Sequence, residues 1–208
     1  MAFSIIYNKY INTLLRTFLR PFSKLIPTKY KFPINGVFTI KEKDIPAFKV
    51  CTNPTSWFSK KIFWDDVEGF EYNSVRIFKD VVKSADVFFD IGSNIGYYSL
   101  LASSIKNKNI LVYAFEPMPS AFGYLTKNAE INGFHNIHPQ LLALSNSKGE
   151  ATFYSILNEK FKHFPQLTGD GGLSKVQSGN RTKVNFDVKT MTLDGFAEEH
   201  LGVKKIDL

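Results

Sequence analysis

One short segment of this sequence has the residue types of a nucleoside-binding turn. Residues 90–96 read Asp-Ile-Gly-Ser-Asn-Ile-Gly and follow the apolar run 87–89, which predicts a turn at the end of a buried strand. Glu116 ends the next apolar run. Ligands of open α/β sheets bind at the carboxyl ends of the strands, where the first turn and the acid of the second strand converge. We therefore expect Gly92 to let the backbone approach a ligand and Glu116 to accept hydrogen bonds from ribose hydroxyls.

The spacing within this turn favours S-adenosylmethionine over a dinucleotide. The dinucleotide pattern G-x-G-x-x-G, counted from Gly92, needs glycines where Asn94 and Tyr97 stand. Asp90 would also repel a pyrophosphate. S-adenosylmethionine carries a sulfonium and an ammonium against one carboxylate, so its net charge is positive and the acids Asp90 and Glu116 suit it. A nucleotide-dependent oxidoreductase is the less favoured alternative.

The elements that must position these residues follow the order of a doubly wound α/β domain. Apolar runs and helical periodicity alternate from residue 86 onward, which favours a Rossmann-like, mostly parallel sheet with right-handed crossovers. The predicted strands cover 87–90, 111–115 and 137–144, and the predicted helices cover 96–105 and 120–132. Beyond them we predict strands over 151–154 and 184–188, a helix over 193–200 and a fourth central strand from Lys205.

Two of these segments resemble sequence motifs of the FkbM-type methyltransferases. Residues 87–100 (VFFDIGSNIGYYSL) are similar to the first motif of that family, and residues 114–117 (AFEP) are similar to the second. Further landmarks are residues 128–133, 143–145 with Gly149, and 192–194. The resemblance implies a class I methyltransferase fold over residues 71–208 and S-adenosylmethionine as the methyl donor. It also implies a hydroxyl acceptor on a sugar, glycan or other natural product.

The resemblance assigns roles to individual residues. It implies that the first turn lines the methionine end of the cofactor, that the acid of the second strand holds the ribose, and that two later residues lie near the adenine. The predicted cofactor site comprises Asp90, Gly92, Ser93, Asn94, Gly96, Glu116, Pro117, Ala143 and Leu144. A purely structural interpretation stands beside it, because glycines also form ordinary strand-to-helix turns and carboxylates also cap helices.

The excess positive charge lies at the N-terminus. The net charge is +7, and residues 1–40 hold six basic residues and no acid, so the remainder carries 7 − 6 = +1. Residues 5–20 predict an amphipathic helix with Ile11, Leu14 and Phe18 on its apolar side. This helix either packs on the domain or contacts an anionic membrane. Its apolar run is too short to span a membrane.

We divide the chain into a basic helical segment (1–31), an extension with short strands (32–70) and the methyltransferase domain (71–208). The extension has strand-like pieces at 37–40 and 48–51, and a helix is predicted over 73–82. A single cysteine and four histidines without ligand spacing predict no disulfide and no metal site. Because the bulk of the chain is nearly neutral, we expect no nucleic-acid partner. We expect a cytoplasmic protein, with membrane contact through residues 1–31 as an alternative.

The sequence contains no compelling catalytic base. Glu71 is a weak candidate, and a solvated glutamate at a helix start is its ordinary explanation. The polar stretch 158–182 predicts an irregular connection that could border the acceptor pocket. By the resemblance, an acidic active-site turn should follow the fourth strand, so we expect the C-terminal part of the domain to lie beyond Leu208. We expect the 208-residue chain alone to transfer no methyl group. A non-catalytic, membrane-associated cofactor-binding fragment is a further alternative.

Overall fold

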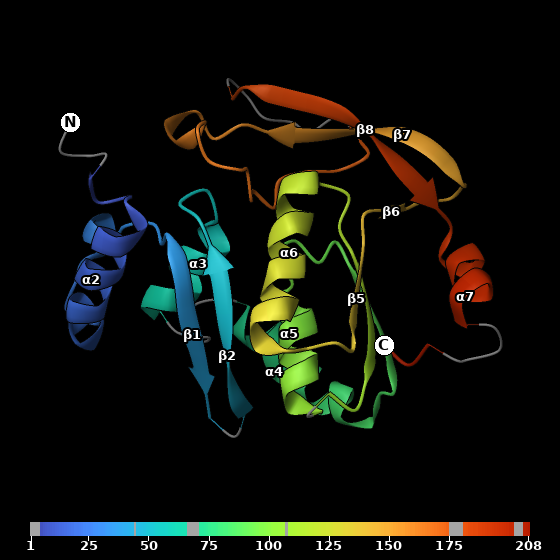
Figure 1. Ribbon diagram of the computed structural model, residues 1–208, viewed down its shortest axis with the longest axis horizontal. Helices are drawn as coiled ribbons and strands as arrows, with labels where there is room; N and C mark the ends of the chain where they lie inside the picture. Colours follow the sequence, from blue (N-terminus) through green and yellow to red (C-terminus); the bar gives the residue numbers. More distant parts are fainter. Residues whose placement is uncertain (1–4, 44, 66–70, 107, 175–180, 202–205) are drawn as a thin grey trace.

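The computed structural model describes residues 5–43, 45–65, 71–106, 108–174, 181–201 and 206–208. Figure 1 shows these residues as successive layers: the helix α2 (Lys9–Leu19), a two-stranded antiparallel sheet, a helical layer, a parallel sheet and the helix α7 (Leu193–Leu201). The helical layer contains α4 (Tyr72–Val81), α5 (Tyr97–Ile105) and α6 (Pro119–Asn132).

The central sheet is parallel, as the sequence predicts. Its strands β3 (Val87–Ile91), β4 (Leu111–Phe115) and β5 (Ile137–Gln140) pair in the order β3-β4-β5. The bounds of β4 match the predicted strand, and α5 and α6 follow their strands as the crossover helices of a Rossmann-like fold. The prediction of a doubly wound α/β fold is therefore confirmed.

The last residues of the chain lie along the other edge of β3. The backbone N–H of Asp207 donates to the carbonyl of Val87 (3.1 Å), and the N–H of Phe89 donates to the carbonyl of Leu208 (2.8 Å). These residues therefore occupy the fourth position in the spatial order 3-2-1-4 of a doubly wound sheet. Residues 206–208 form no regular strand, and Lys205, the predicted start of that strand, lies outside the described residues.

Successive side chains of β3 point to opposite faces of the sheet, and each face has its own core. Phe88 belongs to the large hydrophobic cluster that includes Leu100 of α5 and Leu125 of α6. Val87 and Phe89 belong to a smaller cluster with Phe196 of α7. The sheet is therefore covered on both faces, which explains why residues 87–89 of β3 are all apolar rather than alternating with polar residues.

The extension forms a hairpin on the outer side of α5 and α6. Strands β1 (Gly36–Glu42) and β2 (Ile45–Thr52) pair in antiparallel fashion, and both enclose the predicted strand pieces. The helix α3 (Trp57–Asp65) follows, and the sequence analysis did not predict it. The predicted helix over 73–82 corresponds to α4 and the 3₁₀ turn η4 (Val82–Ser84).

The predicted strand over 137–144 is wrong in its extent. The chain leaves the central sheet at Gln140, and β6 (Ala143–Leu144) joins a second sheet instead. There it pairs with β8 (Lys183–Met191), which also pairs in antiparallel fashion with β7 (Gly149–Ile156). One predicted strand therefore contributes to two sheets, and its sequence pattern alone does not reveal the break.

The basic helix α2 is shorter than predicted and docks with an unexpected face. The side chain of Asn8 accepts hydrogen bonds from the N–H groups of the first turn, so the helix begins at Lys9 rather than at residue 5. It ends at Leu19, before the 3₁₀ turn η1 (Arg20–Phe22) that contains Pro21. The buried residues of α2 are polar (Asn12 and Arg16), while Ile11, Leu14 and Phe18 of its predicted apolar side are exposed. Among the described residues, no helix is both long and apolar enough to cross a membrane.

Candidate functional site

The turn after β3 is built from left-handed backbone conformations. The φ angles are 75° at Gly92, 49° at Asn94 and 87° at Gly96. Glycine adopts such positive φ angles without strain, whereas most residues with a side chain do not. The N–H groups of Gly92 and Ser93 both donate to the carbonyl of Phe115 (2.9 and 3.0 Å), so the turn is fixed to the end of β4. The sequence therefore brings the first turn and the second strand together, as predicted.

The two carboxylate oxygens of Asp90 differ in their hydrogen bonds. Its Oδ2 accepts hydrogen bonds from the backbone N–H (3.0 Å) and the hydroxyl of Ser99, in the first turn of α5. Within the described part of the chain, no hydrogen bond reaches its Oδ1, and Asp90 lines a cavity. Burial raises the pKa of Asp90 to about 6, against the lowering effect of the two bonds from Ser99.

Glu116 joins the two halves of the predicted site. Its Oε2 accepts a hydrogen bond from the N–H of Asn94 (2.8 Å), and its Oε1 accepts one from the N–H of Met118 (2.8 Å). The carboxylate is almost fully buried. Burial raises the pKa of Glu116 to about 7, the two amide bonds lower it, and the nearby Asp90 raises it further.

The chemistry of these two acids fits a positively charged nucleoside. No described lysine or arginine forms an ion pair with Asp90 or Glu116. Because a carboxylate can accept about four hydrogen bonds, both acids keep acceptor capacity beyond their backbone contacts. The sulfonium and ammonium groups of S-adenosylmethionine would supply the missing positive charge, whereas a pyrophosphate would add a third negative group. The residues present therefore fit this cofactor.

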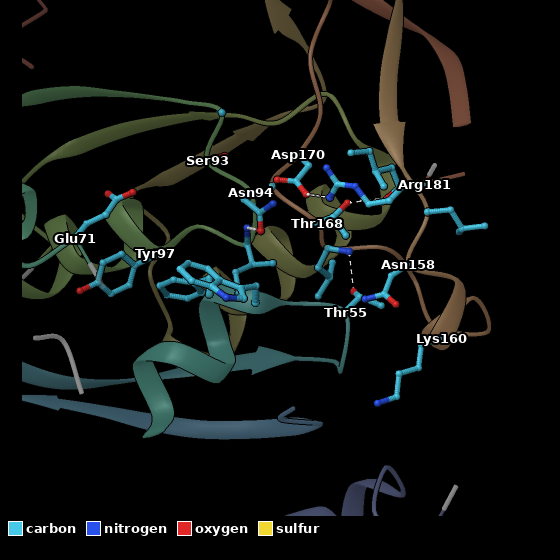
Figure 2. Close-up of a pocket in the computed structure, with 18 of the residues that line it drawn as sticks. Thr55, Glu71, Ser93, Asn94, Tyr97, Asn158, Lys160, Thr168, Asp170 and Arg181 are labelled. Atoms are coloured by element: carbon cyan, nitrogen blue, oxygen red, sulfur yellow. Dashed lines mark hydrogen bonds and ion pairs between the residues drawn. The ribbon is translucent and has the colours of Figure 1, made fainter. Parts of the chain in front are cut away.

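The turn opens into a cavity of about 1120 Å³ (Figure 2). Figure 2 shows Glu71 and Tyr97 on one side of this cavity, Asn94 in the middle, and Asn158, Lys160 and Arg181 on the other side. Small-molecule sites are typically roughly 300–1,000 Å³ in volume. The space is therefore sufficient for a cofactor and a second ligand.

Four of the nine residues predicted to bind the cofactor line this cavity, and the others do not. Asp90, Gly92, Ser93 and Asn94 are in its wall, and Glu116 lies behind the turn, where it supports Asn94. Gly96 has a packing role, because a Cβ atom there would lie 2.5 Å from a methyl carbon of Leu125. The remaining residues outside the wall are Pro117, Ala143 and Leu144. The cofactor contacts of all nine residues stay predictions.

Much of the cavity wall comes from residues that the sequence analysis did not select. Thr55, just before α3, and Trp57 and Phe58, in its first turn, line one wall, and residues 156–160 and 167–170 line another from the end of β7 and the long connection after it. The Thr55 hydroxyl accepts a hydrogen bond from the N–H of Leu167 (2.8 Å), which ties these two walls together. From the sequence, only the irregular character of residues 158–182 indicated that the connection after β7 borders the pocket.

Glu71 reaches the same cavity from the start of α4. Its backbone is left-handed (φ 44°), and its Oε2 accepts a hydrogen bond from the hydroxyl of Tyr98 (2.8 Å). Burial, followed by the contact with Glu71, raises the pKa of Tyr98, so Tyr98 stays a hydrogen-bond donor. The weak candidate base from the sequence therefore lines the same cavity as Asp90.

Several known proteins are similar to this chain. The hexuronic acid methyltransferase AglP of Haloferax volcanii is 34% identical over 133 residues, which are 64% of this chain and 47% of that protein. The uncharacterized protein MJ1452 of Methanocaldococcus jannaschii is 37% identical over 71 residues, which are 32% of this chain and 26% of that protein. The chain therefore spans about half the length, or less, of these relatives.

A solved structure and a family profile complete the comparison. The S-adenosylmethionine-dependent methyltransferase from Agrobacterium tumefaciens matches with a TM-score of 0.36 and 12% identity, over 57% of this chain and 43% of that one. The profile of the methyltransferase FkbM domain matches residues 90–208, from the acid of the first turn to the last residue. This chain belongs to the FkbM methyltransferase family, whose methyl donor is S-adenosylmethionine.

Proposed function

We propose that the protein transfers a methyl group from S-adenosylmethionine to a hydroxyl oxygen of a sugar. The observation that carries this proposal is the single cavity shared by the turn of Asp90–Asn94 and a polar wall opposite it. That wall presents the amide of Asn158 and the hydroxyls of Thr168 and Thr182, which suit the hydroxyl groups of a sugar. Trp57, which lines the same cavity from the start of α3 and is 62% exposed, adds a flat apolar surface.

The acceptor class is supported by one relative. AglP is a hexuronic acid methyltransferase, and its similarity covers 64% of this chain. A hexuronic acid offers two kinds of oxygen: hydroxyls, which give a methyl ether, and a carboxylate, which gives a methyl ester. We favour the ether, because a hydroxyl acceptor must lose a proton and the cavity contains a group that can take it.

In this mechanism Glu71 is the general base. S-adenosylmethionine, when bound, supplies an activated methyl group. Asp90 and Glu116 would hold the positively charged cofactor by their charge. Glu71 would accept the proton of the acceptor hydroxyl while the hydroxyl oxygen bonds to the methyl carbon, the bond from that carbon to sulfur breaks and S-adenosylhomocysteine leaves. Tyr98 holds the Glu71 carboxylate in place through its hydrogen bond. Methylation of a carboxylate would need no base. Loss of the Glu71 carboxylate should therefore slow methylation of a hydroxyl but not methylation of a carboxylate.

The test is a transfer assay with the full-length protein. It would be supplied with S-adenosylmethionine labelled in its methyl group and, in parallel, with hexuronic-acid oligosaccharides, neutral oligosaccharides and transfer RNA. We expect label in the sugar fraction in a form that mild alkali does not release, because ethers resist alkali and esters do not. Label in RNA, alkali-labile label, or no label in any acceptor would contradict the proposal.

Glu71→Gln is the matching variant, and Glu159→Gln is its control. Both carboxylates line the same cavity, but Glu159 lies at the far wall, where it accepts a hydrogen bond from Thr182. Loss of a general base costs roughly 10²–10⁴-fold in rate. We expect kcat to fall by at least about a hundredfold in Glu71→Gln, with S-adenosylhomocysteine affinity and Glu159→Gln turnover nearly unchanged. Equal kcat values for both variants would remove Glu71 from the mechanism.

A further inference from the structure

The N-terminal helix and the turns that follow it present a row of apolar side chains to the surface. Leu14 and Phe18 are each 72% exposed, Leu25 is 80% exposed, and Phe22 and Ile11 are also exposed. Positions 11, 14, 18, 22 and 25 recur every three or four residues, so along the helical part they share one side. Soluble monomers rarely leave a contiguous apolar patch of this kind without a partner.

The outward direction of this row is fixed by contacts on the opposite side. Asn12 is fully buried, its amide nitrogen donates to the carbonyls of Ile6 and Pro33 (3.0 Å each), and its oxygen accepts from the N–H of Asn35 (2.9 Å). Arg16 is buried beside it and donates to the carbonyl of Val37. Rotating α2 to bury its apolar side would break these bonds and bring apolar side chains against the carbonyls that now pair with Asn12 and Arg16, so these hydrogen bonds favour the observed orientation.

The segment that carries this row has only positively charged side chains. Residues 1–40 contain no aspartate or glutamate. Lys9, Lys24 and Lys29 are exposed. Two other basic residues are already used within the fold: Arg16 is buried, and Lys31 pairs with Asp65. A second copy of the chain would bring two positive surfaces together, whereas an anionic lipid surface complements both the charge and the apolar row.

We propose that residues 9–30 are a docking surface for an anionic membrane. In this arrangement α2 lies flat on the bilayer. Leu14, Phe18 and Phe22 enter the boundary between headgroups and acyl chains, and the exposed lysines contact the anionic headgroups. At about 1.5 Å per residue, the helix is far shorter than a bilayer is thick, so it binds along the surface.

The test is co-sedimentation of the full chain with vesicles. Wild-type protein is expected to sediment with vesicles of phosphatidylcholine and phosphatidylglycerol, and much less with phosphatidylcholine alone. Leu14→Glu/Phe18→Glu should weaken this binding at least about tenfold, since two apolar side chains lose their burial. The matched control is Ile77→Glu on α4, at a side chain 65% exposed, which should leave binding unchanged.

A second variant tests the electrostatic part. Lys24→Gln/Lys29→Gln should weaken binding about fivefold per lysine at low salt, the equivalent of about 1 kcal/mol each, and have little effect at high salt. Because all substituted side chains are exposed, circular dichroism and thermal unfolding should be unchanged. Sedimentation measures no turnover, so this test is independent of the proposed methyl transfer.

Three results would overturn the proposal. One is wild-type protein that does not distinguish anionic from neutral vesicles. Another is undiminished vesicle binding by folded Leu14→Glu/Phe18→Glu. The last is a lipid-free dimer that this variant converts to monomer without any change in vesicle binding, which would assign the apolar row to self-association.

Discussion

Two buried polar sites hold the turn after β3 from opposite sides, and they differ in charge. On one side, the amide nitrogen of Asn128 donates to the carbonyls of Ile95 (2.9 Å) and Cys51 (3.3 Å), and its oxygen accepts from the N–H of Cys51 (2.6 Å). On the other side, Glu116 accepts from the N–H of Asn94, and Asp90 lies nearby. The first site is neutral and the second carries uncompensated negative charge.

The difference separates a structural contact from a ligand site. Asn128 is fully buried, and its hydrogen bonds link α6, β2 and the turn, so every group it meets is paired within the fold. Burial raises the pKa values of the acids Asp90 and Glu116, and no lysine or arginine in the described part of the chain forms an ion pair with either of them. A buried charge without a partner is unfavourable unless a ligand supplies the opposite charge. Four predictions test whether the two sites divide stability and binding in this way.

The largest effect is expected at the neutral site. Asn128→Ala would leave the buried N–H and carbonyl of Cys51 and the carbonyl of Ile95 without partners, at roughly 1–3 kcal/mol for each. We expect a loss of about 4 kcal/mol in the free energy of unfolding, measured with urea. Asn132→Ala removes similar bonds to the exposed Lys49, where water can replace them, and should cost much less. Equal losses would contradict the assignment.

The charged site should respond in the opposite way. Asp90→Asn keeps an oxygen for the N–H of Ser99 but removes the negative charge, so we expect unfolding stability to be unchanged or higher. Affinity for S-adenosylmethionine, measured by calorimetry, should fall by about 2 kcal/mol, or about thirtyfold. Asp86→Asn, at an exposed carboxylate just before β3, is the control. If both variants bind equally well, Asp90 is only a helix cap.

The glycines of the turn allow a matched comparison of packing and access. Gly92 and Gly96 both have positive φ angles, but an added Cβ would meet no atom within 4 Å at Gly92 and would lie 2.5 Å from Leu125 at Gly96. We expect Gly96→Ala to lower the free energy of unfolding by about 1.5 kcal/mol. Gly92 lines the cavity. Compared with Gly96→Ala, Gly92→Ala should therefore lower the free energy of unfolding less and the affinity for the cofactor more. The reverse pattern would place the ligand elsewhere.

The smallest effect is a pH dependence of stability. Because burial raises the pKa of Glu116 from 4.5 to about 7, the folded protein retains a proton that the unfolded chain has released. The contribution of Glu116 to the free energy of unfolding is therefore fully present below about pH 4.5 and is lost as the pH rises through about 7. Relative to Glu116→Gln, which does not titrate, wild-type stability should fall by about 1 kcal/mol between pH 6 and pH 7. Saturating S-adenosylmethionine should reduce this fall, and a rise would refute the raised pKa.

The elements around the cofactor turn were predictable because their signals are local. The apolar run 111–115 forms β4 with the predicted bounds, and α6 ends at Asn132, as predicted, because Gly133 takes up a left-handed conformation (φ 62°). The two acids lie where the strand pattern predicted them. The break after Gln140 and the helix α3 were not predicted, because an apolar run does not specify which sheet it joins.

The sequence by itself determined the parallel sheet, the glycine turn and the meeting of Asp90 and Glu116 at one edge, since strand period and turn chemistry are properties of short segments. Only the tertiary structure decided the far wall of the cavity and the orientation of α2. The amphipathic pattern shows that the two faces of α2 differ, but not which one is buried. That choice depends on the carbonyls of Pro33 and Val37, which pair with Asn12 and Arg16 only once the chain has folded back onto the helix.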